Sequence, residues 1–232
     1  MTGTVVNVAA ICIGSILGLV IKRGIPERVS ETVMQGLALA VILIGLQMAF
    51  QTRNPLIVIG SLALGGLVGA AIDIEGKLDR LGRWLESKVG GNGHGEIGRA
   101  FVAASLIFCV GAMAIMGSIE DGLTGEAKTL FAKSMLDGIA SIIFASTMGI
   151  GVIFSAVPVL VYQGSITLAA GAVSPYLSPW VVAELTATGG LIIVGIGVTI
   201  LNVNGFRVRV GNLLPAIFIA AAVTMVLENL KL

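Results

Sequence analysis

Long segments without any charged residue dominate this sequence. Seven segments contain no Asp, Glu, Lys or Arg: residues 1–21, 32–52, 54–72, 100–119, 138–183, 185–206 and 210–227. A helix of about 20 apolar residues crosses the hydrocarbon core of a bilayer, so six of these segments each fit one crossing. The segment 138–183 is long enough for two. The sequence therefore predicts an integral membrane protein.

The spans are expected to be α-helices, because backbone groups in lipid must form hydrogen bonds within their own segment. The alternating strands of a membrane barrel are not visible in the sequence. We expect eight spans, near residues 4–21, 32–50, 55–74, 99–118, 130–147, 150–172, 180–202 and 210–229. The span 130–147 carries Lys133 and Asp137 near its start, so it is alternatively a re-entrant or half-buried helix, which would leave seven crossings.

Composition supports an all-α, polytopic transmembrane helical bundle. Apolar residues make up 56% of the chain and charged residues 12%, against roughly 45–50% and 25% in soluble domains. The 14 basic and 13 acidic residues nearly cancel, which gives no reason to expect nucleic acid as a partner. The lipid bilayer is the one partner that the composition requires.

Basic residues predict the orientation, since they gather on the inner side of a membrane. With the N-terminus outside and eight spans, ten of the 14 basic residues lie inside: Lys22, Arg23, Arg28, Lys77, Arg80, Arg83, Lys88, Arg99, Arg207 and Arg209. Arg53, Lys128, Lys133 and Lys231 lie outside. In the seven-span alternative, nine basic residues lie inside and five lie outside.

The chain is expected to form one membrane domain with two halves. Residues 1–89 hold three spans and an amphipathic helix, in which Ile74, Leu78, Leu81 and Leu85 share one face. This pattern fits either a helix in the inner membrane interface or a solvated connector. The glycine-rich segment 90–98 is the predicted linker, and 99–232 hold the other spans.

Two kinds of internal pattern suggest how the spans pack. Aligning residues 31–46 with 185–200 matches Gly36 with Gly190 and three further pairs, a weak sign of an inverted repeat of spans one to three and six to eight. Two GxxxG patterns, Gly14/Gly18 and Gly65/Gly69, predict close helix contacts within one chain or between the subunits of a homo-oligomer.

Polar residues inside spans are the candidates for function, because they are costly in lipid. Asp137 with Ser141, and Glu184 with Thr186 and Thr188, begin polar stripes along their helices. The alternative for these carboxylates, and for Glu120 and Asp121, is a hydrated position at the interface. The candidate substrate- or ion-binding residues are Asp137, Glu184, Ser141, Thr186, Thr188, Lys133 and Gln163.

Glycine and proline suggest where helices break. Thr147–Gly151 separates the fifth and sixth spans, and Gly189 and Gly190 lie within the seventh. Broken helices free backbone groups that can bind a solute, whereas the alternative for these glycines is plain helix packing.

Enzyme chemistry is not expected. The sequence has no pattern typical of a catalytic constellation, a metal site or a phosphate loop, so we expect no enzyme, no metal and no cofactor.

Several segments resemble those of a known family. They are Phe108–Leu123 (FCVGAMAIMGSIEDGL), Lys133–Gly138 (KSMLDG), Tyr162–Ser165 (YQGS), Glu184–Gly190 (ELTATGG) and Asn212–Ala216 (NLLPA). The chain is similar over essentially its whole length to the DUF554 family of prokaryotic inner-membrane proteins. The resemblance implies a multi-pass protein of the bacterial or archaeal cytoplasmic membrane and assigns no role to any residue.

Three functions remain open at this stage. The first is a transporter or permease for a small solute or ion, with its site among the polar residues of the second half. The second is a channel lined by the same residues. The third is a membrane scaffold or partner subunit, in which the polar residues only fix helix packing.

Overall fold

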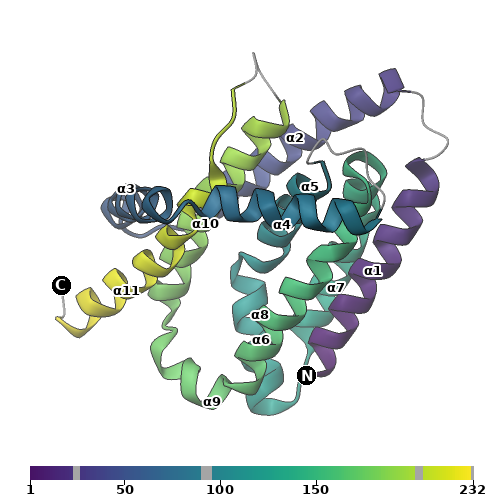
Figure 1. Ribbon diagram of the computed structural model, residues 1–232. Helices are drawn as coiled ribbons and strands as arrows, with labels where there is room; N and C mark the ends of the chain where they lie inside the picture. Colours follow the sequence, from purple (N-terminus) through teal and green to yellow (C-terminus); the bar gives the residue numbers. More distant parts are fainter. Residues whose placement is uncertain (23–26, 90–95, 202–205, 231–232) are drawn as a thin grey trace. The chain divides into compact units, whose positions relative to one another are not determined.

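The computed structural model describes residues 1–22, 27–89, 96–201 and 206–230, which contain helices and no strands. The α-helices are α1 (Thr2–Lys22), α2 (Glu27–Ala49), α3 (Pro55–Ile72), α4 (Ile74–Val89), α5 (Glu96–Cys109), α6 (Ala112–Thr124), α7 (Lys128–Met148), α8 (Ala156–Leu168), α9 (Ala170–Val173), α10 (Pro179–Leu201) and α11 (Pro215–Asn229). Three short 3-10 helices are η1 (Ile150–Ser155), η2 (Ser174–Tyr176) and η4 (Val210–Leu213). The all-α membrane fold predicted from the sequence is confirmed (Figure 1).

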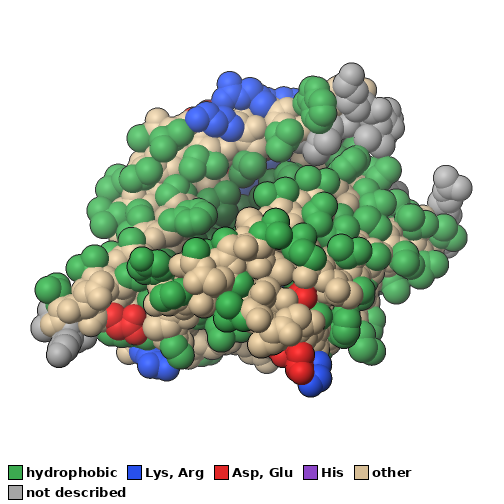
Figure 2. Space-filling view, turned by 90° about the horizontal axis from the view of Figure 1, so that it is seen from below, with side chains coloured by type: hydrophobic (Ala, Val, Ile, Leu, Met, Phe, Trp, Pro, Cys, Tyr) green, Lys and Arg blue, Asp and Glu red, His purple; other side chains and the backbone are tan. Residues whose placement is uncertain are grey.

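Seven straight segments are long and apolar enough to cross a membrane: Thr2–Ile21, Glu31–Ala49, Pro55–Ile72, Lys128–Met148, Ile150–Leu168, Pro179–Leu201 and Val210–Asn229. They match seven of the eight predicted spans. Apolar side chains cover much of the visible surface, as expected for helices that face lipid (Figure 2).

The remaining predicted span, near 99–118, is a bent pair of helices rather than one rod. α5 and α6 meet at an angle of 59°, and Gly111 at the bend has φ +148°, which favours glycine. The next predicted span, 130–147, for which a re-entrant or half-buried helix was the alternative, is one helix of 21 residues, α7.

The amphipathic segment forms the helix α4, as predicted. The predicted linker 90–98 ends earlier than expected, because α5 already begins at Glu96 and buries Gly98. Glu96 favours a helix start, since its negative charge lies at the positive end of the helix dipole. Residues 90–95 of the linker, Arg23 and Lys231 lie outside the described residues.

The chain forms two compact units. Unit 1 comprises residues 1–37, 78–109 and 113–172, and unit 2 comprises residues 38–77, 110–112 and 173–232. Each unit takes segments from both sides of the glycine-rich linker, so the linker does not separate the two units. The predicted inverted repeat is not confirmed and stays a prediction.

In unit 1, α1 and α7 pack side by side along their length (Figure 1). A Cβ atom on Gly14 would overlap the carbonyl oxygen of Gly138, and one on Gly18 would overlap that of Ile142. Glycine is therefore required at both positions for the two backbones to approach. The two helices run parallel, since Gly3 faces Leu130 and Gly18 faces Ala145.

In unit 2, α10 packs against α2, α3 and α11. Gly45 of α2 meets Gly190 of α10, while Gly65 and Gly69 of α3 lie against the start of α11. Both GxxxG patterns are thus filled by contacts within the chain. A homo-oligomer would have to use surfaces other than these two glycine faces.

Hydrogen bonds in unit 2 show the direction of its helices. The carboxylate of Glu184, in the first turns of α10, accepts bonds from the turn that begins α3. Glu75, at the start of α4, exchanges bonds with Gly211 and Asn212 just before α11. The starts of α3 and α10 therefore lie together, so these two helices enter the bilayer from the same side.

These directions fix the number of crossings by parity. Parallel neighbours in one bilayer enter it from the same side, so an odd number of crossings separates them along the chain. Between α1 and α7, helices α2 and α3 supply two crossings, and the bent α5–α6 pair must supply the third. Between α3 and α10, the α5–α6 pair, α7 and η1–α8 make three. We infer eight crossings, with both chain ends on the same side.

The crossing by the bent pair is testable within unit 1. Cysteines introduced as Ser87→Cys and Lys128→Cys, in a chain whose native cysteines are replaced, should react with an impermeant thiol reagent from opposite sides of the membrane. Both positions are exposed. Labelling of both from the same side would show that α5–α6 is a re-entrant pair and would contradict the eight-crossing topology.

The glycine contact of α1 with α7 is testable by substitution. Gly14→Ala should destabilise the protein by about 1–3 kcal/mol, because the new methyl group overlaps backbone atoms that cannot move aside independently. Gly60→Ala in α3 is the matched control, since nothing lies within 4 Å of its Cβ position. It should be neutral or stabilising by up to about 1 kcal/mol through helix propensity. Equal melting temperatures for the two variants would contradict the packing argument.

Candidate functional site

Helix α7 carries a buried ion pair near the middle of its length. Asp137 lies nine residues after the start of α7, about 14 Å along an axis that crosses about 30 Å of hydrocarbon. The Lys133 Nζ atom lies 2.6 Å from Asp137 Oδ2, and each residue is only 7% exposed. The pair joins successive turns of one helix, and Ser141 continues the same face one turn further on.

Two amides from other helices complete this group. Asn7 of α1 donates its Nδ2 hydrogen bonds to Asp137 Oδ2 at 3.0 Å and to Gln163 Oε1 at 3.4 Å. Gln163 belongs to α8, and both amide residues are fully buried. We call Asn7, Lys133, Asp137 and Gln163 the buried polar cluster. It joins three membrane-spanning segments of unit 1.

Sequence reasoning found three members of the cluster and missed Asn7. The parallel contact of α1 with α7 places Asn7 against Asp137, and no spacing within the sequence could show that pairing. A signal was nevertheless present, since an amide inside the otherwise apolar segment 1–21 needs a partner in lipid.

The cluster is not fully hydrogen-bonded. The Oδ1 atom of Asn7 and the Nε2 atom of Gln163 are buried and have no partner in the structure. The hydroxyls of Thr4, Ser141 and Thr167 are also buried without a partner. Each of these lies one helical turn from a cluster residue on the same helix face. Five polar atoms on these helix faces therefore have unused hydrogen-bonding capacity.

Glu184 lies in unit 2 and has a different environment. Its Oε2 accepts a bond from the Thr52 hydroxyl at 2.6 Å. Its Oε1 accepts bonds from the backbone N–H groups of Arg53 at 2.7 Å and Asn54 at 3.0 Å, and from the indole N–H of Trp180 at 3.1 Å. A carboxylate at the positive end of α3 with four donors is well stabilised. Glu184 thus holds the start of α3 against α10.

Thr186 and Thr188 follow Glu184 on α10 and are buried. Their hydroxyl oxygens have no hydrogen-bond partner in the structure. The predicted candidates therefore divide into one group in unit 1 and one in unit 2. Gly189 and Gly190 lie in an unbroken helix, where Gly190 contacts the backbone of α2, so these two glycines serve packing.

The predicted break between the fifth and sixth spans is confirmed. α7 ends at Gly149, whose φ of +86° favours glycine, and the chain continues as the 3-10 helix η1 before α8. A Cβ atom on Gly151 would overlap the carbonyl oxygen of Ile97, so η1 lies tightly against α5. Two of the helices that form the cluster are thus joined by a short 3-10 segment that follows Gly149 and contains Gly151.

Asp121 at the end of α6 is buried rather than hydrated. It accepts a hydrogen bond from the backbone N–H of Gly3 at 3.1 Å and pairs with the amine of Met1 at 2.9 Å. Asp121 therefore holds the start of α1. In the part of the chain that the structure describes, no three His, Cys, Asp or Glu residues come together as metal ligands.

The role of Glu184 can be tested by comparing two substitutions. Glu184→Ala should lower the free energy of unfolding by at least about 2 kcal/mol, because it leaves buried donors without an acceptor. Glu184→Gln should cost less than about 1 kcal/mol, since its amide oxygen can still accept the three N–H bonds. Thermal unfolding in detergent measures both. If Gln is as damaging as Ala, the negative charge rather than the hydrogen bonds holds α3.

Comparison with known proteins agrees with the resemblance seen in the sequence. The family described as "Protein of unknown function (DUF554)" matches residues 2–225. "Uncharacterized membrane protein YdfK" of Bacillus subtilis is 33% identical, over 98% of this chain and 97% of that protein. "Uncharacterized protein YqgA" of Escherichia coli is 30% identical, over 94% of each chain. No solved structure matches significantly.

The family match covers nearly the whole chain and includes every residue of the buried polar cluster. The relatives cover the chain at nearly full length, and one of them is named as a membrane protein, in agreement with the seven long apolar helices. The protein is a multi-pass membrane protein and belongs to the DUF554 family.

Proposed function

We propose that this protein is a transporter or permease for a small solute or ion, and that the buried polar cluster is its binding site. The observation that carries the proposal is the set of partnerless polar atoms beside the Lys133–Asp137 pair, within helices long enough to span a membrane. A ligand bound at the cluster would supply the missing partners.

The energetic argument follows from the cost of leaving polar atoms unpaired. Each buried donor or acceptor without a partner costs about 1–3 kcal/mol. Five such atoms would be an expensive way to hold three helices together. In a binding site the cost is offset whenever the ligand, or water that precedes it, is present. The cluster therefore favours a binding role over pure packing.

The closed state of the cluster favours a carrier over a channel. Lys133 and Asp137 are in direct contact at 2.6 Å and almost completely buried. A carrier needs such an occluded state, whereas an open channel needs a continuous polar path. Gly149, where α7 ends, is a suitable hinge for opening the cluster.

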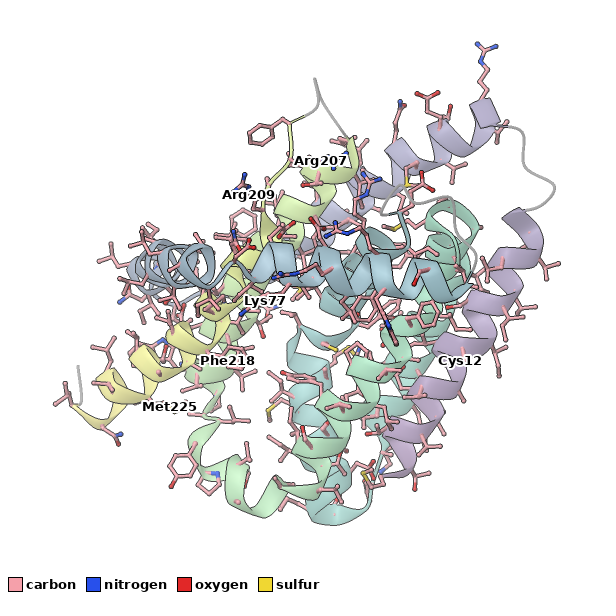
Figure 3. The ribbon with its side chains drawn as sticks, viewed as in Figure 1. Cys12, Lys77, Arg207, Arg209, Phe218 and Met225 are labelled. Carbon is pink, nitrogen blue, oxygen red and sulfur yellow. The ribbon has the colours of Figure 1, made fainter. Side chains whose placement is uncertain are left out.

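Membrane sidedness follows from the basic residues. The hydrogen bonds of Glu75 place the start of α4 beside η4, so Lys77 and Arg209 lie at the same end of unit 2, as does Arg207 (Figure 3). The bias of basic residues supports a cytoplasmic position for this end. With eight crossings, we therefore propose that both termini lie on the outer side of a prokaryotic cytoplasmic membrane.

Access of water to the cluster tests the proposal. Cys12 and Cys109 are replaced by alanine, and Ser141→Cys is introduced at the buried hydroxyl next to Asp137. The thiol should react with a small polar reagent applied to native membranes from either side, because the carrier exposes its site alternately. Thr188→Cys, read in the same way, tests the group in unit 2.

Thr224→Cys is the matched control for buried position. Thr224 is fully buried in α11, and its hydroxyl donates to the Ala220 carbonyl oxygen at 2.7 Å, so it has no unpaired atom. It should stay unlabelled. If the folded Ser141→Cys protein is as unreactive as this control, the cluster is a packing element and the transporter proposal is wrong.

A further inference from the structure

We propose that the solute bound at the buried polar cluster is a small zwitterion, a molecule that carries both an ammonium and a carboxylate group. The inference rests on the proposed transport function and names its substrate class. The inference is based on the Lys133–Asp137 ion pair, whose two charges cancel. Beside this pair lie an acceptor and a donor without a partner, Asn7 Oδ1 and Gln163 Nε2.

The first argument concerns net charge. Lys133 and Asp137 neutralise each other in a buried position. A simple cation bound to Asp137 would leave the ammonium group of Lys133 buried without a partner. A simple anion bound to Lys133 would likewise leave the carboxylate of Asp137 buried without a partner. Either arrangement is strongly unfavourable. A zwitterion replaces both partners at once, because its ammonium pairs with Asp137 and its carboxylate with Lys133.

The second argument concerns the open hydrogen-bonding atoms. Asn7 Oδ1 is an acceptor on the amide that already touches Asp137, so it can accept a bond from an ammonium group there. Gln163 Nε2 is a donor, as is the ammonium of Lys133, and both suit a carboxylate. The cluster thus offers two acceptors for a cationic group and two donors for an anionic one.

The orientation of both amides follows from Asp137. An ionised carboxylate only accepts hydrogen bonds, so Asn7 must direct its NH2 group at Asp137. The same NH2 group reaches Gln163, which must therefore present its oxygen to Asn7. This leaves the oxygen of Asn7 and the nitrogen of Gln163 open. The hydrogen bonds that lead from Asp137 to Asn7 and on to Gln163 thus determine which amide atoms lack a partner.

The surroundings add no competing ion pair. Among the described residues, the other ion pair that involves α7 joins its first residue, Lys128, to Glu126 just before the helix, and both side chains are exposed.

Binding to the purified full-length protein in detergent tests the inference. The twenty protein amino acids and glycine betaine are the probes, measured singly by thermal shift and by calorimetry. For the best binder, two matched half-probes follow: the amine that lacks the carboxyl group and the acid that lacks the amine. We expect saturable binding of at least one zwitterion, and binding of each half-probe weaker by about 30-fold or more, equivalent to about 2 kcal/mol.

Variants locate the binding at the cluster. Asp137→Asn and Lys133→Met should each weaken binding of the zwitterion by about 30-fold or more. The double variant Lys133→Gln/Asp137→Asn leaves no unpaired charge, so it should fold even if the single variants do not, and it should not bind. Lys128→Met is the control, since it removes an exposed lysine from the same helix, and its binding should equal that of the unchanged protein.

The outcomes separate the two proposals. If a half-probe or an uncharged solute binds as tightly as the zwitterion, or if the cluster variants bind the zwitterion normally, the zwitterion site is wrong. If no probe binds while Ser141→Cys is labelled from both sides, the substrate class is wrong and the transporter proposal stands. If no probe binds and Ser141→Cys is unreactive, both proposals fail.

Discussion

The close contact between α1 and α7 is the interaction on which unit 1 depends. Gly14 and Gly18 lie directly on backbone carbonyl groups of α7, and no larger residue fits at either position. This contact brings Asn7 within hydrogen-bond distance of Asp137. Because Asn7 also reaches Gln163, one helix contact organises polar groups from three spans. In lipid, where water does not supply partners, such contacts decide which polar groups are tolerated.

Two buried carboxylates show two uses of the same chemical group. Glu184 accepts four hydrogen bonds, and all of its donors belong to the turn before α3 or to its own helix. Glu184 therefore connects α10 to the start of α3 in unit 2. Asp137 has two donors on one oxygen and lies among atoms that lack partners. The first arrangement is complete without a ligand and the second is not, so Asp137 is the better candidate for binding.

The spans could be predicted from the sequence because length and the absence of charge suffice to identify a crossing helix. Lys133 and Asp137 left a re-entrant α7 as an alternative, since two charges suggest a helix that leaves the lipid, while in fact they neutralise each other on one face. The bend at Gly111 was missed because glycine is common in straight membrane helices. Asn7 was missed because its role depends on a neighbour 130 residues away.

An argument from stability bears on why the ion pair exists. Replacing a buried ion pair by apolar residues of similar size is often neutral or stabilises a protein by about 1–4 kcal/mol. Stability alone therefore does not explain Lys133 and Asp137, and it explains still less the unpaired atoms of Asn7 and Gln163. A site that must hold opposite charges part of the time requires groups that are costly the rest of the time, and the buried polar cluster has that composition.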